Sequence, residues 1–548
     1  MAEATAARIE TSDEDGNSDD AGLATERDDA EDEGKEPETS QAVTERFEQQ
    51  VRDLLQWVNE RGNRSGLFGS FEIALIPKVF ALARTLVQLF LALRNERLSK
   101  DLPTKQRVRG KWFTAQNPKR RHLGGFFGKV CFWRKYYSRD GGGEGFHPLD
   151  ADLGLTTDGF SLHVVSLACR LATRMPYEAA SSLMSLFIGE PPSHTTIEHM
   201  VLGLGAHARA YMEQAVPPPG DGEVLVFQID LKCVPTARDA ELGRRRGKRP
   251  PNPHPESARH RGRQKRRRAG PKKRRKKGDK SKNGRAVTLV VMYTLKVSPD
   301  GLLLGPINKM QYASFAGKRY GFAWARAMAN RRGFTPESGK RIQFVSDGNP
   351  DFRIYLRDYF GDYGKDQLLQ TLDLPHVMEY VWKAGTACHR EGSEELSTWA
   401  HKQKRNLLLS RGDLVVRQLK TILAGVPKTG PGNKSKRKRL TDAIDYIQNN
   451  LDRMDYKYLR DQDLELASGA CEGAVNYVIG LRFDHGGMRW IVERAEALLQ
   501  LRCIELNGEW DDFMAWLGMA STGTSQTVQS LNKAPASLPQ KAHTATGR

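Results

Sequence analysis

The chain has 548 residues, 39% of them hydrophobic, and carries 85 Lys and Arg against 66 Asp and Glu, a formal net charge of +19. This length is too great for one compact core and predicts roughly two to four folded units joined by linkers. A basic excess of this size favours a polyanionic partner, either nucleic acid or an acidic membrane surface. Six scattered cysteines without a Cys-x-x-Cys pair argue against a disulfide framework and a zinc ribbon.

Residues 1–40 form an acidic segment with 15 Asp and Glu against 3 Lys and Arg, so the rest of the chain carries +31. Because this segment has almost no apolar residues, it cannot offset the entropy lost on ordering and is predicted to be disordered. It would act as a solubilising tail or, alternatively, as an acidic arm that competes with DNA for the basic regions. An acidic N-terminus also differs from the basic and then apolar pattern of a signal peptide.

Residues 41–105 are predicted to be helical, because apolar side chains recur there at three- and four-residue spacings. The first of them are Phe47, Val51, Leu54, Leu55 and Val58. The most apolar run, Leu67 to Leu93, contains charged residues, so it is predicted to be a buried or paired helix and not a membrane span.

Residues 106–216 are interpreted as a DNA-binding region that begins with basic, aromatic strands and continues as helices. Ser193 is placed to cap a helix that starts at His194, after a shorter helix and a Gly-Pro turn. This layout fits a helix-turn-helix whose second helix reads the major groove with Thr195, Thr196 and His199. A plain helical bundle has the same layout and remains the alternative.

Residues 221–376 are predicted to form the first part of an α/β core. Four β-branched, apolar runs predict strands, and the segment 320–329 between the second and third predicts a helix. The expected strands cover residues 223–232, 286–296, 341–349 and 367–373. The first ends near Asp230 and the third ends at Asp347-Gly348.

A polybasic insertion, residues 244–285, interrupts this core between the first two strands. It contains 21 Lys and Arg with Glu256 and Asp279 as its acids, so it is predicted to be unfolded in isolation. Its charge density suits the neutralisation of DNA phosphates, although a solvated charged segment is the simpler alternative. The predicted phosphate contacts are Arg266, Arg267, Arg268, Lys272, Lys273, Arg274, Arg275, Lys276 and Lys277.

Residues 377–467 are predicted to be a helical insertion, and residues 468–515 to be the closing helices of the core. The first closing helix carries Glu472, and an amphipathic helix over 491–506 follows a Gly-Gly break. Residues 516–548 are predicted to be a disordered tail.

Three acids are the candidate catalytic and metal-binding residues: Asp230, Asp347 and Glu472. Acids at the ends of core strands and on a packed helix are costly unless a cation neutralises them. Two Mg²⁺ or Mn²⁺ ions held by carboxylates would stabilise the attacking and leaving oxygens of a phosphoryl transfer. Taken alone, Asp347 before a glycine could be a simple turn residue, so the prediction rests on the ordered set.

Several motifs resemble the DDE transposases of bacterial insertion sequences, most closely the ISKra family. They are YYSRDGGGEGFHPLDADLGL, VFQIDLK, FVSDGN, TLDLPHVMEYVW, SGACEGAVNYVIGLRFDHGGMRW and LRCIELNGEWDDF, and they span residues 125–515. The resemblance implies a ribonuclease-H-like fold with a helical insertion and places Asp230, Asp347 and Glu472 at the catalytic positions. It also implies a bacterial, cytoplasmic, nucleoid-associated protein that acts as a homo-oligomer on double-stranded DNA, at element ends and target, without a membrane partner.

The chain departs from this family in two places. Relatives often carry paired cysteines where this chain reads SRDGGGEG, so no zinc site is expected, and the polybasic insertion is longer than the family pattern. Asp373 and His376 recur in the pattern and are interpreted mainly as neighbours of the active site, with His376 as a possible helper that positions water or phosphate.

The sequence therefore predicts a transposase that cuts and joins DNA strands. Two alternatives stay open: a catalytically silent DNA-binding protein derived from such an enzyme, and a structure-selective nuclease on the same fold. Within the leading hypothesis Glu472 is the least secure assignment, because Glu493 and Glu496 lie on the next helix and compete for the role.

Overall fold

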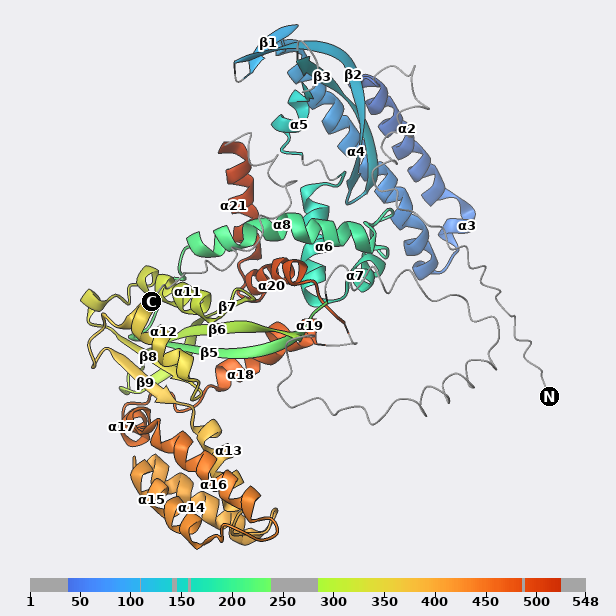
Figure 1. The fold of residues 1–548 in the computed structure, drawn as a ribbon. Coiled ribbons are helices and arrows are strands. Elements are labelled where there is room, and N and C mark those ends of the chain that lie inside the picture. Colours follow the sequence, from blue (N-terminus) through green and yellow to red (C-terminus); the bar gives the residue numbers. More distant parts are fainter. Residues whose placement is uncertain are drawn as a thin grey trace, which may run out of the picture. The chain divides into compact units, whose positions relative to one another are not determined.

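A computed structural model describes residues 38–108, 110–139, 145–155, 159–237, 284–484 and 488–523. The chain divides into two compact units, Met1–Leu162 with Ile188–Glu190, and His163–Phe187 with Pro191–Arg548 (Figure 1). The prediction of disorder for the acidic segment is wrong at Ser40, which begins a helix, and its residues 1–37 lie outside the described residues. The predictions for nearly all of the polybasic insertion, with its nine candidate phosphate contacts, and for the end of the tail also lie outside them.

The first unit combines long helices with an antiparallel sheet. Its helices are α2 (Ser40–Asn59), α3 (Arg61–Arg64), α4 (Phe68–Asp101) and α5 (Pro148–Asp152). Its strands, in sheet order, are β1 (Lys105–Val108), β2 (Lys111–Gly125), β3 (Gly128–Arg139) and β4 (Gly145–Phe146). The predicted helices and basic strands are confirmed. These strands pack with the helices before them, and the predicted region 106–216 spans both units.

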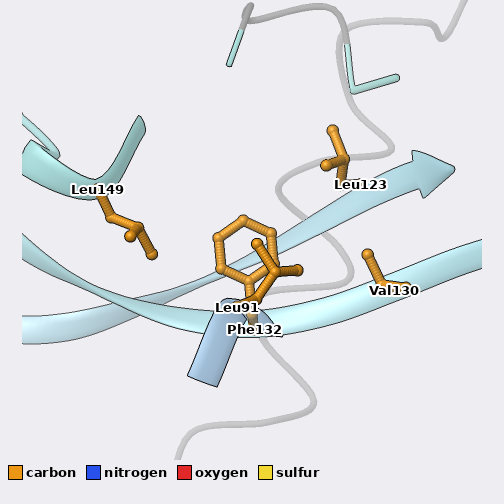
Figure 2. Close-up of a cluster of buried hydrophobic side chains, with 5 residues drawn as sticks. All are labelled: Leu91, Leu123, Val130, Phe132 and Leu149. Atoms are coloured by element: carbon orange, nitrogen blue, oxygen red, sulfur yellow. The ribbon is translucent and has the colours of Figure 1, made fainter. Parts of the chain in front are cut away.

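A small apolar core joins α4, the sheet and α5 in this unit (Figure 2). Leu91 from α4 meets Leu123 on β2, Val130 and Phe132 on β3, and Leu149 on α5. Val130 and Phe132 lie two residues apart and therefore point to the same face of the sheet. Each such side chain stabilises the unit by about 1.5–3 kcal/mol when it is fully buried.

For helix α4 the sequence predicts burial or pairing, and only the pairing is confirmed. The helix packs against α2 and β3, and the rings of Trp57 on α2 and Phe71 on α4 stack at 5.2 Å. Its buried residues are Thr85 and Leu91, and its most apolar window is only 6% buried. Many of its apolar side chains are exposed, so the described part of its own unit covers only part of the helix surface. By length and composition alone it is also a candidate membrane span, a test that core helices of soluble proteins pass as well.

The second unit opens with α6 (Leu162–Arg174), α7 (Tyr177–Met184) and α8 (His194–Gln214). The predicted cap is confirmed, since the Ser193 side chain accepts the backbone N–H of Thr196. Nine residues separate α7 from α8, more than the three or four of a helix-turn-helix turn. Helix α8 also packs closely on a later helix of the unit, where a Cβ on Gly205 would lie 2.7 Å from the Ala497 side chain. This layout matches the helical-bundle alternative.

A five-stranded mixed sheet forms the centre of the second unit, which has an α/β fold. Its strands are β5 (Val224–Pro235), β6 (Gly284–Val297), β7 (Leu303–Ser314), β8 (Arg341–Ser346) and β9 (Leu368–Leu372). The order is β7-β6-β5-β8-β9, with β6 antiparallel to β5 and β7, and with β8 parallel to β5 and β9. The four predicted strands are confirmed. Strand β7 is not predicted from the sequence, because Gly305, Pro306 and Lys309 interrupt the apolar run that would indicate a strand.

Aromatic packing covers one face of this sheet. The ring of Phe227 on β5 stacks on Phe344 of β8 at 4.7 Å and on Phe360 at 4.9 Å. Phe360 ends α12 (Pro350–Phe360), and α11 (Lys318–Arg331) adds Phe322. Because side chains alternate along a strand, the neighbours of Phe227 on β5 point to the opposite face, where the candidate site lies.

The predicted helical insertion is confirmed as a run of helices between β9 and the closing segment (Figure 1). They are α13 (Leu374–Gly385), α14 (Glu394–Leu408), α15 (Gly412–Gly425), α16 (Asn433–Gln448) and α17 (Tyr456–Asp461). The closing segment contains α18 (Gly469–Ala474), a π-helical turn (Val475–Gly480), α19 (Leu481–Phe483), α20 (Val492–Leu506) and α21 (Trp510–Gly523). Helix α21 extends past residue 515, so the prediction of a disordered tail from 516 is wrong for residues 516–523.

Candidate active site

Three aspartates occupy matching positions on β5 and directly after the parallel strands β8 and β9. Val345 pairs with Gln228 on one side and with Thr371 on the other. Two residues further along the chain stand Asp230 within β5, Asp347 just past β8 and Asp373 just past β9. The backbone N–H of Asp373 donates to the Ser346 carbonyl at 2.9 Å. Since side chains repeat their direction every second residue, the three carboxylates belong to one face and one edge region of the sheet.

Asp230 is a half-buried carboxylate in this row. Burial raises its pKa, and the negative charges of Asp347 and Asp373 raise it further, against the lowering effects of the Leu231 backbone N–H and of His376. The Leu231 N–H donates to its Oδ1 at 2.6 Å. The fold therefore holds a poorly solvated carboxylate beside two others, an arrangement that a bound cation would compensate.

Asp347 is positioned by the loop that follows β8 and by the helical insertion. Its Oδ1 accepts the Asn349 backbone N–H at 3.0 Å, and the Gly348 N–H donates to the Tyr446 hydroxyl of α16 at 3.0 Å. A Cβ at Gly348 would lie 2.4 Å from the Tyr446 ring, so only glycine allows this approach. Asp347 is thus both the turn residue of the simpler hypothesis and a member of the carboxylate row.

Asp373 is fully buried, and its carboxylate contacts both Ser468 and His376. Its Oδ1 accepts the Ser468 backbone N–H at 3.2 Å, and its Oδ2 accepts the Ser468 hydroxyl at 2.8 Å and contacts Nδ1 of His376. The hydrogen bond to Asp373 raises the pKa of His376 to about 9, despite the opposing effect of burial. The histidine therefore carries a positive charge at neutral pH, next to the row of carboxylates.

Glu472 reaches the same place from α18. Its Oε1 lies 3.9 Å from His376 Nδ1, and its side chain is 52% exposed. Asp373, His376 and Glu472 offer ligand atoms that all lie within 4.8 Å of one another, and no other such group occurs among the described residues. Two of the three predicted catalytic acids, Asp230 and Asp347, therefore lie in one row with Asp373. The third, Glu472, lies next to His376, which contacts Asp373.

Two buried glutamines explain how Glu472 comes to this position. Gln228 on β5 accepts the Cys471 backbone N–H at 2.9 Å and donates to the Ala467 carbonyl at 3.3 Å. Gln343 on β8 accepts the Glu465 N–H at 3.0 Å and donates to its carbonyl at 2.7 Å. The two amides dock the backbone of residues 465–471 on the sheet in place of water, and α18 starts from that anchor.

The other candidate residues have different surroundings. Glu496 is held by the Ser314 hydroxyl at 2.6 Å and the Phe315 N–H at 2.7 Å, while Glu493 lies exposed on the first turn of α20. Among the described residues, this geometry favours Glu472 as the third acid. The hydroxyls of Thr195 and Thr196 lie 2.9 and 2.8 Å from the Ser193 hydroxyl, and His199 is exposed.

The sequence predicts Asp373 mainly as a neighbour of the active site, and it predicts no role for Gln228 or Gln343. For Asp373 a local signal exists, since an acid directly after a strand is followed by Pro375 in the first turn of a helix and by His376 one turn on. For the glutamines the only signal is a polar residue inside an apolar run.

The chain was also compared with known proteins. No protein-family model and no curated protein matches it.

Proposed function

We propose that this protein is a DNA transposase that cleaves and joins DNA strands with divalent cations held on a ribonuclease-H-like core. The observation that carries the proposal is the row of Asp230, Asp347 and Asp373 with Glu472 beside it. A mixed sheet in the order β7-β6-β5-β8-β9, in which β6 runs antiparallel to both of its neighbours, fits the ribonuclease-H-like core that the family resemblance implies.

The donor set suits a hard cation. Asp230, Asp347 and Glu472 would hold Mg²⁺ or Mn²⁺, because carboxylate oxygens are the ligands these ions prefer. When bound, two such ions neutralise the scissile phosphate and stabilise the attacking and leaving oxygens. Asp373 has a different role, because both its oxygens are engaged, and it orients His376 and the Ser468 backbone.

In this proposal His376 is the side chain that binds the DNA phosphate. Charged His376, held by Asp373, positions a phosphate oxygen beside Glu472. In cleavage, a water oxygen bonds to phosphorus, the bond to the 3′ oxygen breaks, and that oxygen takes a proton to become a 3′-hydroxyl. In strand transfer the oxygen of that hydroxyl bonds to a phosphorus of the target, and the bond from this phosphorus to the target's 3′ oxygen breaks. The displaced oxygen takes up a proton in place of the one that the attacking hydroxyl releases.

Metal removal is the direct test of this proposal. The full-length protein, incubated with duplex DNA that carries the sequences flanking its own coding region, is expected to nick and join strands with Mg²⁺ or Mn²⁺ and to stop when EDTA is added. Gel analysis of end-labelled DNA separates the outcomes. Cleavage without joined products would indicate the nuclease, and tight binding without cleavage would indicate the silent DNA-binding protein.

The polybasic insertion gives a second prediction, on affinity. Deletion of residues 244–285, with a short Gly/Ser bridge, is expected to weaken binding to specific and to scrambled duplexes by similar factors. Phosphate contacts release counterions, with a log–log salt slope of about −0.9 per contact, so the slope should become shallower by several units. Binding isotherms at several salt concentrations measure both effects. Loss of sequence preference with an unchanged slope would make the segment a base reader instead.

A further inference from the structure

Helix α4 has three faces, and the described residues of its own unit cover two of them. One faces α2, where Arg46 donates to Gln88 at 2.9 Å and the Ser40 N–H to Glu96 at 2.7 Å. The second faces the sheet through Leu91, with Val87 and Leu98 packed against the same cluster. The third face contains large apolar side chains that are exposed: Ile76, Val79, Leu86, Phe90 and Leu93. Monomeric soluble proteins rarely leave a continuous apolar stripe of this length uncovered.

The spacing of this third face is that of a coiled coil. Its positions are Ile76, Val79, Ala83, Leu86, Phe90 and Leu93, which alternate steps of three and four residues. A strict three-four alternation keeps a seam facing one partner helix, whereas a broader stripe serves a globular core. The six positions span about 26 Å at ~1.5 Å per residue. The face is therefore shaped for another α-helix.

The same seam is self-complementary when two copies run antiparallel. A twofold axis between Ala83 and Leu86 places Ile76 opposite Leu93, Val79 opposite Phe90, and Ala83 opposite Leu86 of the partner. One step beyond the apolar layers, the axis places Glu72 opposite Arg97. Both side chains are exposed, and neither has an ion pair within the residues that the structure describes. A parallel pairing would set like charges against each other at both ends.

We propose that the exposed face of α4, the α4 seam formed by these six residues, is a homodimer interface in which α4 pairs antiparallel with α4 of a second copy. Twofold pairing uses one patch on both copies, as closed symmetric dimers require. The seam is apolar in its centre and oppositely charged at its ends, so it offers a second copy both a hydrophobic contact and a fixed direction. The pairing involves no residue of the candidate active site and needs no DNA.

The oligomeric state of the full-length protein without DNA tests the proposal. Sedimentation velocity is expected to show a dimer for the native protein, and Leu86→Glu or Phe90→Glu is expected to weaken dimerisation on the order of a hundredfold or more, because each change buries two unpaired charges. These side chains are 46% and 55% exposed, so the single unit keeps its fold, which circular dichroism verifies. Leu55→Glu on α2, at a 59% exposed leucine that is not one of the six seam residues, is the matched control and should stay dimeric.

Charge reversal tests the direction of the pair. Glu72→Arg and Arg97→Glu should each weaken the dimer on the order of tenfold, and the double variant should restore it, since only the antiparallel arrangement sets 72 against 97. A double variant as weak as its parents would overturn the antiparallel register. A native protein that is monomeric at tens of micromolar and instead floats with phosphatidylglycerol–phosphatidylethanolamine vesicles would overturn the homodimer and assign the face to a membrane.

Discussion

Asp230→Asn and Asp347→Asn proteins are each expected to lose DNA cleavage by on the order of 10³-fold or more while they bind DNA nearly as well as the native protein. The two carboxylates are neighbours in one row at the parallel strands, and neither forms an ion pair within the described residues. Backbone N–H groups and His376 offset part of their energetic cost, and in the proposed function a bound cation would offset the rest. Amides cannot supply the lost charge. Cleavage rates at saturating Mg²⁺, together with binding isotherms on the same DNA, measure the two effects separately.

The stability of these variants gives an internal check. Asp230 is a desolvated carboxylate beside two others, so its removal should leave the melting temperature in metal-free buffer unchanged or higher. A loss of activity that came from unfolding would lower it. Normal cleavage by Asp230→Asn would end the assignment.

The third acid is tested by three matched changes: Glu472→Gln, Glu493→Gln and Glu496→Gln. Glu472→Gln should be inactive and stable, because its half-exposed side chain lies beside His376 and carries little packing. Glu493→Gln should be active. Glu496→Gln should lower stability before activity, since Glu496 accepts the Ser314 hydroxyl and the Phe315 N–H. If Glu493→Gln alone were inactive, the third position would belong to α20.

Replacement of Asp373 by alanine is expected to have the largest effect on stability, a loss of about 3–5 kcal/mol in the free energy of unfolding. The carboxylate is fully buried and accepts the Ser468 N–H, the Ser468 hydroxyl and His376, so its removal leaves buried donors and a positive charge without a partner. Chemical denaturation of the full-length protein measures the change.

Two controls separate the charge of Asp373 from its hydrogen bonds. Asp373→Asn keeps an acceptor for the Ser468 N–H but loses the charge that faces His376, so its destabilisation should be intermediate. Asp366→Ala removes an exposed aspartate just before β9 and should change stability little. An Asp373→Ala protein as stable as Asp366→Ala would show that the contacts of Asp373 with Ser468 and His376 do not stabilise the fold.

Local sequence patterns were enough to identify the strands that end at acids and the helices of the insertion. Apolar runs that stop at Asp347 and Asp373 are such patterns, and so is the cap at Ser193. Local patterns also placed Glu472 on a helix. For α4 they predicted burial or pairing without deciding between the two, because periodicity registers how apolar a helix is, whereas burial depends on which of its faces find partners.

The way these pieces meet depends on tertiary contacts. The register of β5, β8 and β9 aligns Asp230, Asp347 and Asp373, although β6 and β7 intervene in the chain. The Ser468 bond to Asp373 and the Cys471 bond to Gln228 join residues 95 and 243 positions apart. In the protein interior every buried hydrogen-bond donor needs an acceptor, and these contacts form where side-chain amides and carboxylates meet that need. The partners come from distant parts of the chain, so a short stretch of sequence cannot predict which residues will pair.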